Sequence, residues 1–397
     1  MATPCHIEKL KRETYLRYLF AKHHVAPGSQ AASFEEVINS VVGVHSARLP
    51  TPYVAFQARM NGITPADYRS ATYGSNRLIK LRCMRKTLHT VTQELAPIVH
   101  VATLALRTAG FQLQFERNGF KLDTVEDVTL EALNTELKTP QSHKQVLLWL
   151  SLRLSQLKPN LSFKKANGLA RILLKWAWET GRICYLNRAA HWTREMRFYG
   201  STASLYPRLT LNAYTREQAV RELVARHVRA FEPVSEQDIA WWSGISVKEV
   251  RAALQRLAPR LLRVGLEGVA DNLLMTQDGF HEYVRLRQQT DTLPWCAFLA
   301  YEDPTLKGYF DTRTRYVDQA DYGKLFNQIG EVRPSVHING RAVGIWSWNV
   351  KASRISVQLF RSLSNDERAA ISLKRQELEA FLDETTQLKL LLDSSGA

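Results

Sequence analysis

Hydrophobic positions between residues 235 and 276 predict two short helices, which a β-hairpin follows. In the second helix Val250, Leu254 and Leu257 recur at the spacing that places side chains on one buried face. Gly244 separates this helix from the first one, because glycine readily ends a helix. The pattern therefore indicates a helix, a tight turn and a second helix.

Each of these helices is preceded by a serine with an acidic residue three positions later, the pairs Ser235/Asp238 and Ser246/Glu249. Such pairs bond the free amides of a first helical turn and mark where a helix begins. After the second helix, two apolar runs joined through a glycine-containing turn predict paired strands at 261–264 and 273–275.

Helix, turn, helix and hairpin is the arrangement of a winged helix, whose second helix commonly enters the major groove of DNA. Lys248 and Arg251 lie off the buried stripe of that helix and are expected to contact DNA. The alternative is a packing module, because many winged helices serve protein contacts.

Two earlier stretches have a similar order of helices and extended segments. The first has a helix capped by Ser33 and Glu36 and an extended basic run at 78–92; the second has helices from Thr139 and from Ser162 to Thr180, then a strand at 183–186. We therefore expect three tandem winged-helix units, at residues 1–120, 121–209 and 210–289.

In the C-terminal part, residues 290–397, the sequence pattern predicts a β-domain. Asn339-Gly340 joins two apolar runs and favours a tight hairpin turn, and residues 354–359 alternate polar and apolar side chains. Ser364 and Glu367 then cap a terminal helix. The expected fold class is α+β: tandem winged-helix units, a small C-terminal β-barrel or β-sheet domain, and a terminal helix.

Charge favours a polyanionic partner. The chain has 53 Lys and Arg against 38 Asp and Glu, a formal net charge of +15. Such a surplus attracts phosphates and releases their counterions. Membrane surfaces would attract it as well, but no apolar run is long enough to span a bilayer, and residues 1–12 lack the apolar core of a secretory signal. We expect a monomer in the cytoplasm, associated with the nucleoid.

The cysteines form no recognisable site. Cys5, Cys83, Cys184 and Cys296 stand singly, without a CxxC pair or the spacing of zinc ligands. The chain also has no phosphate-binding loop and no dinucleotide fingerprint. We expect no metal and no cofactor.

Several short motifs, in order along the chain, resemble the AlkZ/YcaQ-like winged-helix DNA glycosylases. They are GVHSARLPTPY at 43–53, MRKTLH at 84–89, IAWWSG at 239–244, YEDP at 301–304, GY at 308–309 and GIW at 344–346. The resemblance covers nearly the whole chain. It implies tandem winged helices curved around DNA with a C-terminal β-domain, and an activity that removes alkylated purines. Some members of the family unhook interstrand crosslinks or remove bulky natural-product adducts.

The chain departs from the family at the catalytic motif. A Gln-x-Gln or Gln-x-Asp motif is expected there, and this chain has His45, Ser46 and Ala47. A neutral imidazole can orient or deprotonate the attacking water, so activity is expected to fall at acid pH. Ser46 can hold a water or simply pack, and Ala47 supplies no polar group. The alternative for His45 is a structural histidine at a helix end.

The residues expected to contact DNA, by their charge and position, are Arg48, Arg59, Arg85, Lys86, Thr87, His89, Lys164, Lys165, Lys248 and Arg251. Cations of this kind fix a protein on the DNA backbone without reading sequence. Three alternatives stay open. Arg59 can form a structural ion pair, for example with Asp67; the extended segment of Arg85 can be a solvated strand; and the lysine pair can be a solvated helix face.

The leading interpretation is a monofunctional DNA glycosylase that hydrolyses the N-glycosidic bond of alkylated or bulky purine adducts in double-stranded DNA. Unhooking of crosslinks and self-resistance to a DNA-alkylating natural product are extensions of that activity. The alternative is a DNA-binding protein without catalysis, a regulator or damage sensor that has lost its catalytic pair. Extrusion of the base and attack on a base in place are both compatible with these residues.

Overall fold

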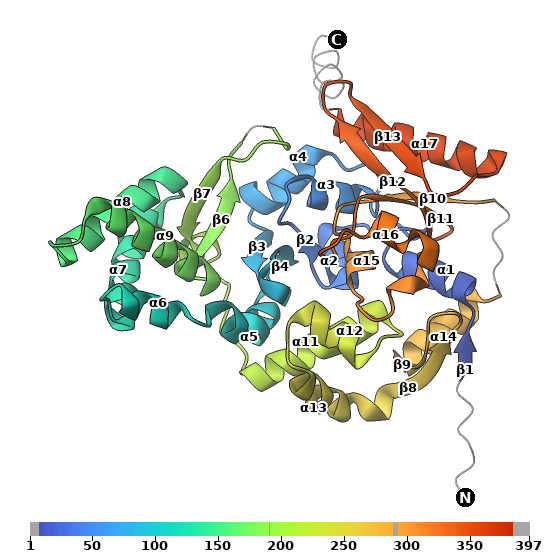
Figure 1. The fold of residues 1–397 in the computed structure, drawn as a ribbon, viewed down its shortest axis with the longest axis horizontal. Coiled ribbons are helices and arrows are strands. Elements are labelled where there is room, and N and C mark those ends of the chain that lie inside the picture. Colours follow the sequence, from blue (N-terminus) through green and yellow to red (C-terminus); the bar gives the residue numbers. More distant parts are fainter. Residues whose placement is uncertain (1–7, 190, 289–292, 384–397) are drawn as a thin grey trace, which may run out of the picture. The chain divides into compact units, whose positions relative to one another are not determined.

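The computed structural model describes residues 8–189, 191–288 and 293–383. The chain divides into two compact units: unit 1 contains Met1–Tyr68, Val224–Trp242 and Ser246–Ala397, and unit 2 contains Arg69–Leu223 and Ser243–Ile245. Figure 1 follows the chain through both units. The finer division into four domains remains a prediction.

Unit 1 combines helices with two small sheets. Its helices are α1 (Arg12–Lys22), α2 (Phe34–Val41), α3 (Pro50–Gln57), α13 (Val247–Leu257), α14 (Gln277–Leu286), α15 (Pro304–Lys307), α16 (Tyr322–Leu325) and α17 (Asn365–Leu382). Its strands are β1 (Glu8–Leu10), β2 (Val44–His45), β8 (Leu261–Leu266), β9 (Ala270–Thr276), β10 (Cys296–Leu299), β11 (Ser335–Ile338), β12 (Arg341–Asn349) and β13 (Arg354–Leu359). Three further helices cross a boundary between the units: α4 (Pro65–Arg69), α11 (Arg216–Phe231) and α12 (Glu236–Ser243).

The two helices and the hairpin predicted after residue 235 are present as α12, α13, β8 and β9. The Ser246 hydroxyl accepts a hydrogen bond from the Glu249 amide, and the Glu249 carboxylate accepts one from the Ser246 amide. Gly244 adopts the left-handed conformation, with φ of +76°, that a helix end favours. The local signals therefore located these elements correctly.

The N-terminal segment has a short strand before its first helix. Residues Glu8–Leu10 form β1, which pairs in parallel with β8 and extends the hairpin to a three-stranded sheet. Helix α1 begins only at Arg12, and its buried side chains include Tyr15, Leu19 and Phe20. No local pattern predicts this pairing, because β1 is short and its partner strand is distant in the chain.

The C-terminal strands form an open antiparallel sheet in the order β10-β11-β12-β13. Within the described residues the sheet is not closed, so the β-sheet alternative is correct and the β-barrel alternative is wrong. Ser364 and Glu367 form the expected capping box of α17, which contacts β10 (Figure 1).

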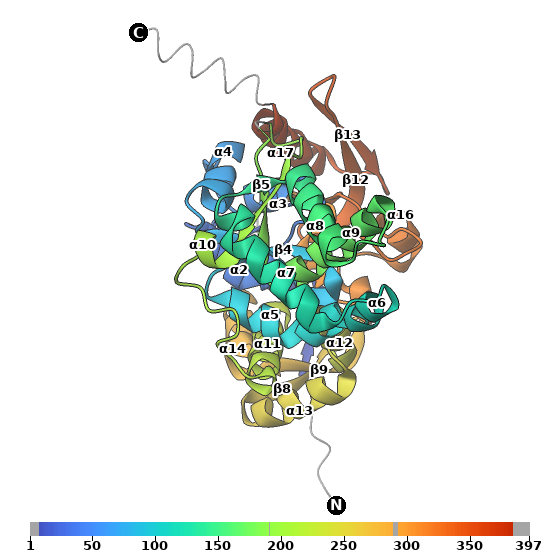
Figure 2. The same cartoon turned by 90° about the vertical axis from the view of Figure 1, so that its left-hand side faces the viewer.

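Unit 2 is mostly helical and has a core of its own. Its helices are α5 (Leu95–Thr108), α6 (Phe111–Arg117), α7 (Leu122–Asn134), α8 (His143–Leu157), α9 (Phe163–Glu179) and α10 (Thr202–Leu205). Its strands are β3 (Leu78–Arg82), β4 (Leu88–Thr92), β5 (Gln141–Ser142), β6 (Ile183–Asn187) and β7 (Arg197–Ser201). Figure 2 shows α7, α8 and α9 side by side, and apolar residues from all three form one buried cluster.

Two predictions in unit 2 can be compared directly. Helix α9 follows Ser162 and ends before Thr180, as expected, with Gly181 at a φ of +72° after it. Helix α8 begins later than the predicted Thr139, because Ser142 and Gln145 form its capping box. No helix in the described part of the chain is both long enough and apolar enough to cross a membrane.

Candidate functional site

The His45 motif occupies a short extended segment of unit 1 between α2 and α3. Val42 and Gly43 both adopt positive φ angles, 52° and 101°, so they turn the chain sharply out of α2. A positive φ is uncommon for a β-branched residue and marks a constrained position. His45 follows on β2 with 7% of its surface exposed, and Ala47 is exposed. His45 is thus buried in unit 1, and only a small part of the residue reaches solvent.

Ser46 is also buried, and its hydroxyl donates a hydrogen bond to the carbonyl oxygen of Val44 at 3.0 Å. Its proton is therefore used within the same turn. This geometry supports a role for Ser46 in holding the segment in place.

Tyr301 anchors the segment that follows His45. The Thr51 hydroxyl donates to the Tyr301 carbonyl oxygen at 2.9 Å, and the Arg48 guanidinium lies 3.8 Å from the centre of the Tyr301 ring. Arg48 also lies 3.9 Å from a carboxylate oxygen of Glu331, and 59% of its side chain is exposed. The Tyr301 hydroxyl, with help from Asn327 and Arg48, lowers the pKa of Glu331, so this carboxylate remains an anion beside Arg48. The contact holds a cation at the surface of unit 1.

Arg59, one of the residues predicted to contact DNA, does not lie at the surface. Its side chain is fully buried, and its two terminal nitrogens donate to the two oxygens of Asp303 at 2.6 and 3.0 Å. One of them also donates to the Thr305 hydroxyl at 2.7 Å. The suggested partner Asp67 instead accepts a hydrogen bond from the Thr64 amide at 2.7 Å. Arg59 is therefore structural, but its partner is Asp303.

In unit 2 the segment 84–89 forms the tip of the β3–β4 hairpin. Arg85 and Lys86 adopt consecutive positive φ angles of 52° and 62°. Non-glycine residues rarely do so, and such backbone is found where the surrounding structure enforces it. Lys86 is exposed and Arg85 is half-buried. The hairpin therefore presents two cations in a fixed turn.

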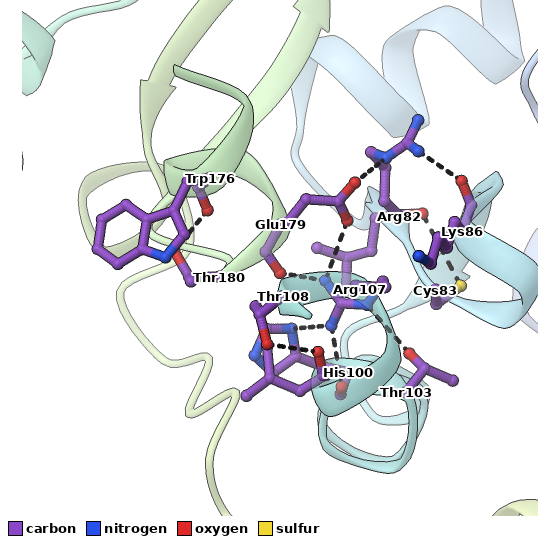
Figure 3. Close-up of polar contacts among 12 residues, drawn as sticks. Arg82, Cys83, Lys86, His100, Thr103, Arg107, Thr108, Trp176, Glu179 and Thr180 are labelled. Atoms are coloured by element: carbon purple, nitrogen blue, oxygen red, sulfur yellow. Dashed lines mark hydrogen bonds and ion pairs between the residues drawn. The ribbon is translucent and has the colours of Figure 1, made fainter. Parts of the chain in front are cut away.

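A buried ionic network supports this turn (Figure 3). Glu179, the last residue of α9, accepts a hydrogen bond from Arg82 at 2.5 Å and lies 3.5 Å from a nitrogen of Arg107. Arg107 also donates to the Glu179 carbonyl oxygen, and Arg82 donates to the Lys86 carbonyl oxygen at 2.5 Å. Glu179 thus connects the end of α9 to the hairpin tip. Glu179 was not among the predicted site residues, although it is the only acidic residue of a helix rich in lysine and arginine.

Thr87 and His89, the other predicted contacts on this hairpin, point toward the protein. The Thr87 hydroxyl donates to the Met84 carbonyl oxygen at 2.9 Å. His89 is buried, and its burial lowers its pKa to about 4, so the ring is neutral at physiological pH. The Thr87 proton is used within the hairpin and the His89 ring is buried, so neither favours a phosphate contact.

The remaining predicted cations are exposed. Lys164 and Lys165 lie in the first turn of α9 in unit 2, and Lys248 and Arg251 lie on α13 in unit 1. Arg251 pairs with Glu236 at 2.7 Å. Because both side chains of this pair are partly solvated, the pair is weak and can be exchanged for a phosphate contact.

The described residues contain no group of three or more His, Cys, Asp or Glu side chains placed to hold a metal ion. In unit 1 the site consists of the His45 imidazole after a constrained turn, and of the Arg48 cation three residues later, which Tyr301 and Glu331 hold in place. Unit 2 offers a fixed cationic hairpin and a basic helix start.

Comparison with solved structures identifies a protein with a similar α+β fold. The fold is similar to that of the DNA glycosylase AlkZ from Streptomyces sahachiroi, with a TM-score of 0.74 over 94% of this chain and 97% of the other, at 16% sequence identity. No curated protein matches the sequence.

The family is shown by the sequence itself. The family model described as DNA glycosylase AlkZ-like matches residues 38–381, which is most of the chain. The protein therefore belongs to the AlkZ-like DNA glycosylase family, a family of DNA repair enzymes, as the motif at residues 43–53 and those that follow it indicated.

Proposed function

We propose that this protein is a monofunctional DNA glycosylase that removes alkylated or bulky purine adducts from double-stranded DNA. The observation that carries the proposal is the position of His45, on the short strand β2 after a constrained turn and two residues before the exposed Ala47. This is the place where the family is expected to carry its catalytic motif.

The chemistry requires little from the protein beyond the placement of a water. Alkylation of a purine ring nitrogen puts a positive charge on the base, which leaves as a neutral purine when the bond to the sugar breaks. The imidazole of His45 accepts a proton from water, and the hydroxide oxygen bonds to the sugar carbon. The products are the free base and an abasic site, with one proton carried away by the imidazole.

Binding is assigned to the cations that the structure leaves at the surface. They are Arg48, Lys248 and Arg251 in unit 1, and Arg85, Lys86, Lys164 and Lys165 in unit 2. Contacts of this type hold the phosphate backbone and leave the base to the catalytic segment. The net charge of +15 has the sign that such binding needs.

We further propose that the protein acts as a monomer in the cytoplasm and that its substrate is the DNA of the nucleoid. We also propose that interstrand crosslinks are accepted where the adduct is bulky, which would give self-resistance to a DNA-alkylating natural product.

A second function, DNA binding without catalysis, is favoured by one observation. Ala47 offers no polar group, and the hydroxyl of its neighbour Ser46 donates to the carbonyl oxygen of Val44. A damage sensor or regulator would need the cationic surface and no catalytic pair.

Excision of a defined lesion separates the two functions. A duplex that contains one 7-methylguanine is incubated with the protein and then heated in alkali, which cleaves the strand at abasic sites. We expect cleavage at the lesion only after incubation with protein, and no cleavage before the alkali step. Binding without release of the base, on both 7-methylguanine and a bulkier N7 adduct, would support the non-catalytic alternative.

Salt dependence tests the binding surface independently of catalysis. We expect the logarithm of the association constant to fall with the logarithm of salt concentration, by about 0.9 for each phosphate contacted. Replacing Lys164 and Lys165 together with alanine should make this slope shallower by about 1 to 2. Lys374→Ala is the control, because Lys374 pairs with Glu377 on α17. An equal slope in the double variant and the wild type would exclude the start of α9 from the interface.

A further inference from the structure

An exposed aromatic ring on unit 1 has no role in the catalytic proposal. Phe310 follows α15 and is 47% exposed, although burial of a phenylalanine is normally favourable. Its ring stacks on that of Trp241 in α12, with the ring centres 5.4 Å apart and an angle of 19° between the planes. Trp241 covers one face of the Phe310 ring, so a further ring can stack on the other face.

The backbone of Phe310 is fixed from the interior. The buried carboxylate of Asp238 accepts hydrogen bonds from the Phe310 amide at 2.6 Å, the Asp311 amide at 2.9 Å and the Thr312 hydroxyl at 2.7 Å. Three hydrogen bonds to one ionised group are a strong restraint. These hydrogen bonds hold the backbone of Phe310 in place, so its ring is kept at the surface.

A buried cation lies against the same rings. The guanidinium carbon of Arg313 is 4.5 Å from the centre of the Trp241 ring and 5.5 Å from that of Phe310. Its Nε donates to the Tyr309 carbonyl oxygen, but within the described residues Arg313 forms no ion pair with a carboxylate and its Nη2 has no hydrogen-bond partner. The positive charge of Arg313 already lies against the two rings. A cationic base stacked on Phe310 would be repelled by this charge, so a neutral base is favoured there.

The aromatic pair is connected to the His45 segment within unit 1. Lys307 lies 5.0 Å from the centre of the Trp241 ring and donates to Glu302 at 2.8 Å. Glu302 is adjacent in the chain to Tyr301, on which Arg48 stacks. These contacts place the aromatic pair and the segment after His45 in one continuous cluster.

We infer that Phe310 binds an unpaired, neutral nucleobase of the DNA, by stacking its free face on that base. This inference rests on the proposed DNA binding and adds a site to it. A base inside a duplex is covered on both faces by its neighbours, so only an unpaired base can offer a face to the ring. The base most suited is the neutral one, for example the base left opposite or beside the adduct.

The test uses 2-aminopurine, a neutral purine whose fluorescence is quenched by stacking. Two duplexes are compared, one with a single unpaired 2-aminopurine and one fully paired. Stacking on an aromatic side chain contributes about 1–3 kcal/mol per base, so we expect Phe310→Ala to bind the first duplex about 5- to 150-fold more weakly and to bind the second as the wild type does. Phe310→Tyr should keep both the affinity and the change in fluorescence.

Leu373→Ala is the matched control, because Leu373 is a 62% exposed apolar residue on α17. Thermal melting of each variant checks the fold. Equal binding of the unpaired duplex by Phe310→Ala and the wild type would overturn the inference, and so would an equal loss on both duplexes. If the wild type still shows steep salt dependence and excises 7-methylguanine, only the stacking site fails. Absence of DNA binding by the wild type would remove both proposals.

Discussion

Replacing Asp303 with alanine should lower the free energy of unfolding by about 3–5 kcal/mol, because the fully buried Arg59 guanidinium would lose its carboxylate. Asp303 also accepts a hydrogen bond from the Thr305 amide at 3.0 Å and so caps α15. Urea denaturation, followed by tryptophan fluorescence and far-ultraviolet circular dichroism, measures the change.

The control for Asp303→Ala is Asp318→Ala. Asp318 pairs with Arg12 and Arg341, but all three side chains are partly exposed, so its loss should cost at most about 1 kcal/mol. Replacing Arg59 with Met and Asp303 with Leu together should recover part of the stability, because no charge is then left unpaired. A cost below about 1 kcal/mol for Asp303→Ala would contradict a structural role for the pair.

The Arg59–Asp303 ion pair shows which features local sequence patterns can predict and which they cannot. Capping boxes depend on residues three positions apart, so Ser246 with Glu249 and Ser364 with Glu367 identified the starts of α13 and α17 correctly. Arg59 and Asp303 are 244 positions apart, and nothing local in either segment specifies the other. The same reason explains the missed pairing of β1 with β8.

The candidate site was predictable to a similar degree. Its location at His45 came from the motif at 43–53, and the extended basic run at 78–92 pointed to the segment that forms β3 and β4. The inward direction of His89 and the buried position of Arg59 depend on packing, which a charge count does not contain. Glu179 and Phe310 were missed because their roles come from partners that only the folded chain brings together.

The His45→Ala variant should lose about 10²- to 10⁴-fold in the rate of 7-methylguanine excision, the range that a positioned general base contributes. Its affinity for the same duplex should stay within about threefold of the wild type, because the exposed cations remain. Single-turnover excision and fluorescence anisotropy separate the two quantities. Ser46→Ala is the control and should lose less than about tenfold, because the Ser46 hydroxyl bonds to the chain itself.

Substitution by glutamine distinguishes the role of the side chain. His45→Gln restores an amide oxygen that can orient a water, so it should keep more activity than His45→Ala. Ala47→Asp adds a carboxylate at an exposed position and should raise the rate, because a negative charge stabilises the developing sugar cation. Excision that is unchanged in His45→Ala would reject His45 as the base while leaving the glycosylase proposal intact.

Acid pH should lower the wild-type rate, because a protonated imidazole accepts no proton from water and repels the sugar cation. The pH profile has to be separated from unfolding. Burial lowers the pKa values of His89, His227 and His337 to about 4, below the value of 6.5 for an ordinary histidine. Unfolding therefore takes up protons below about pH 6.5, and the stability that these neutral rings contribute is complete above that pH and lost as the pH falls.

The assay therefore pairs each rate with a melting temperature at the same pH. We expect the rate to decrease as the pH falls from about 8 toward 5.5, at pH values where the melting temperature is unchanged. The His45→Gln variant should show a flatter profile over this range, since an amide does not titrate. A wild-type rate that stays constant while the melting temperature is constant would argue against His45 as the group that activates the water.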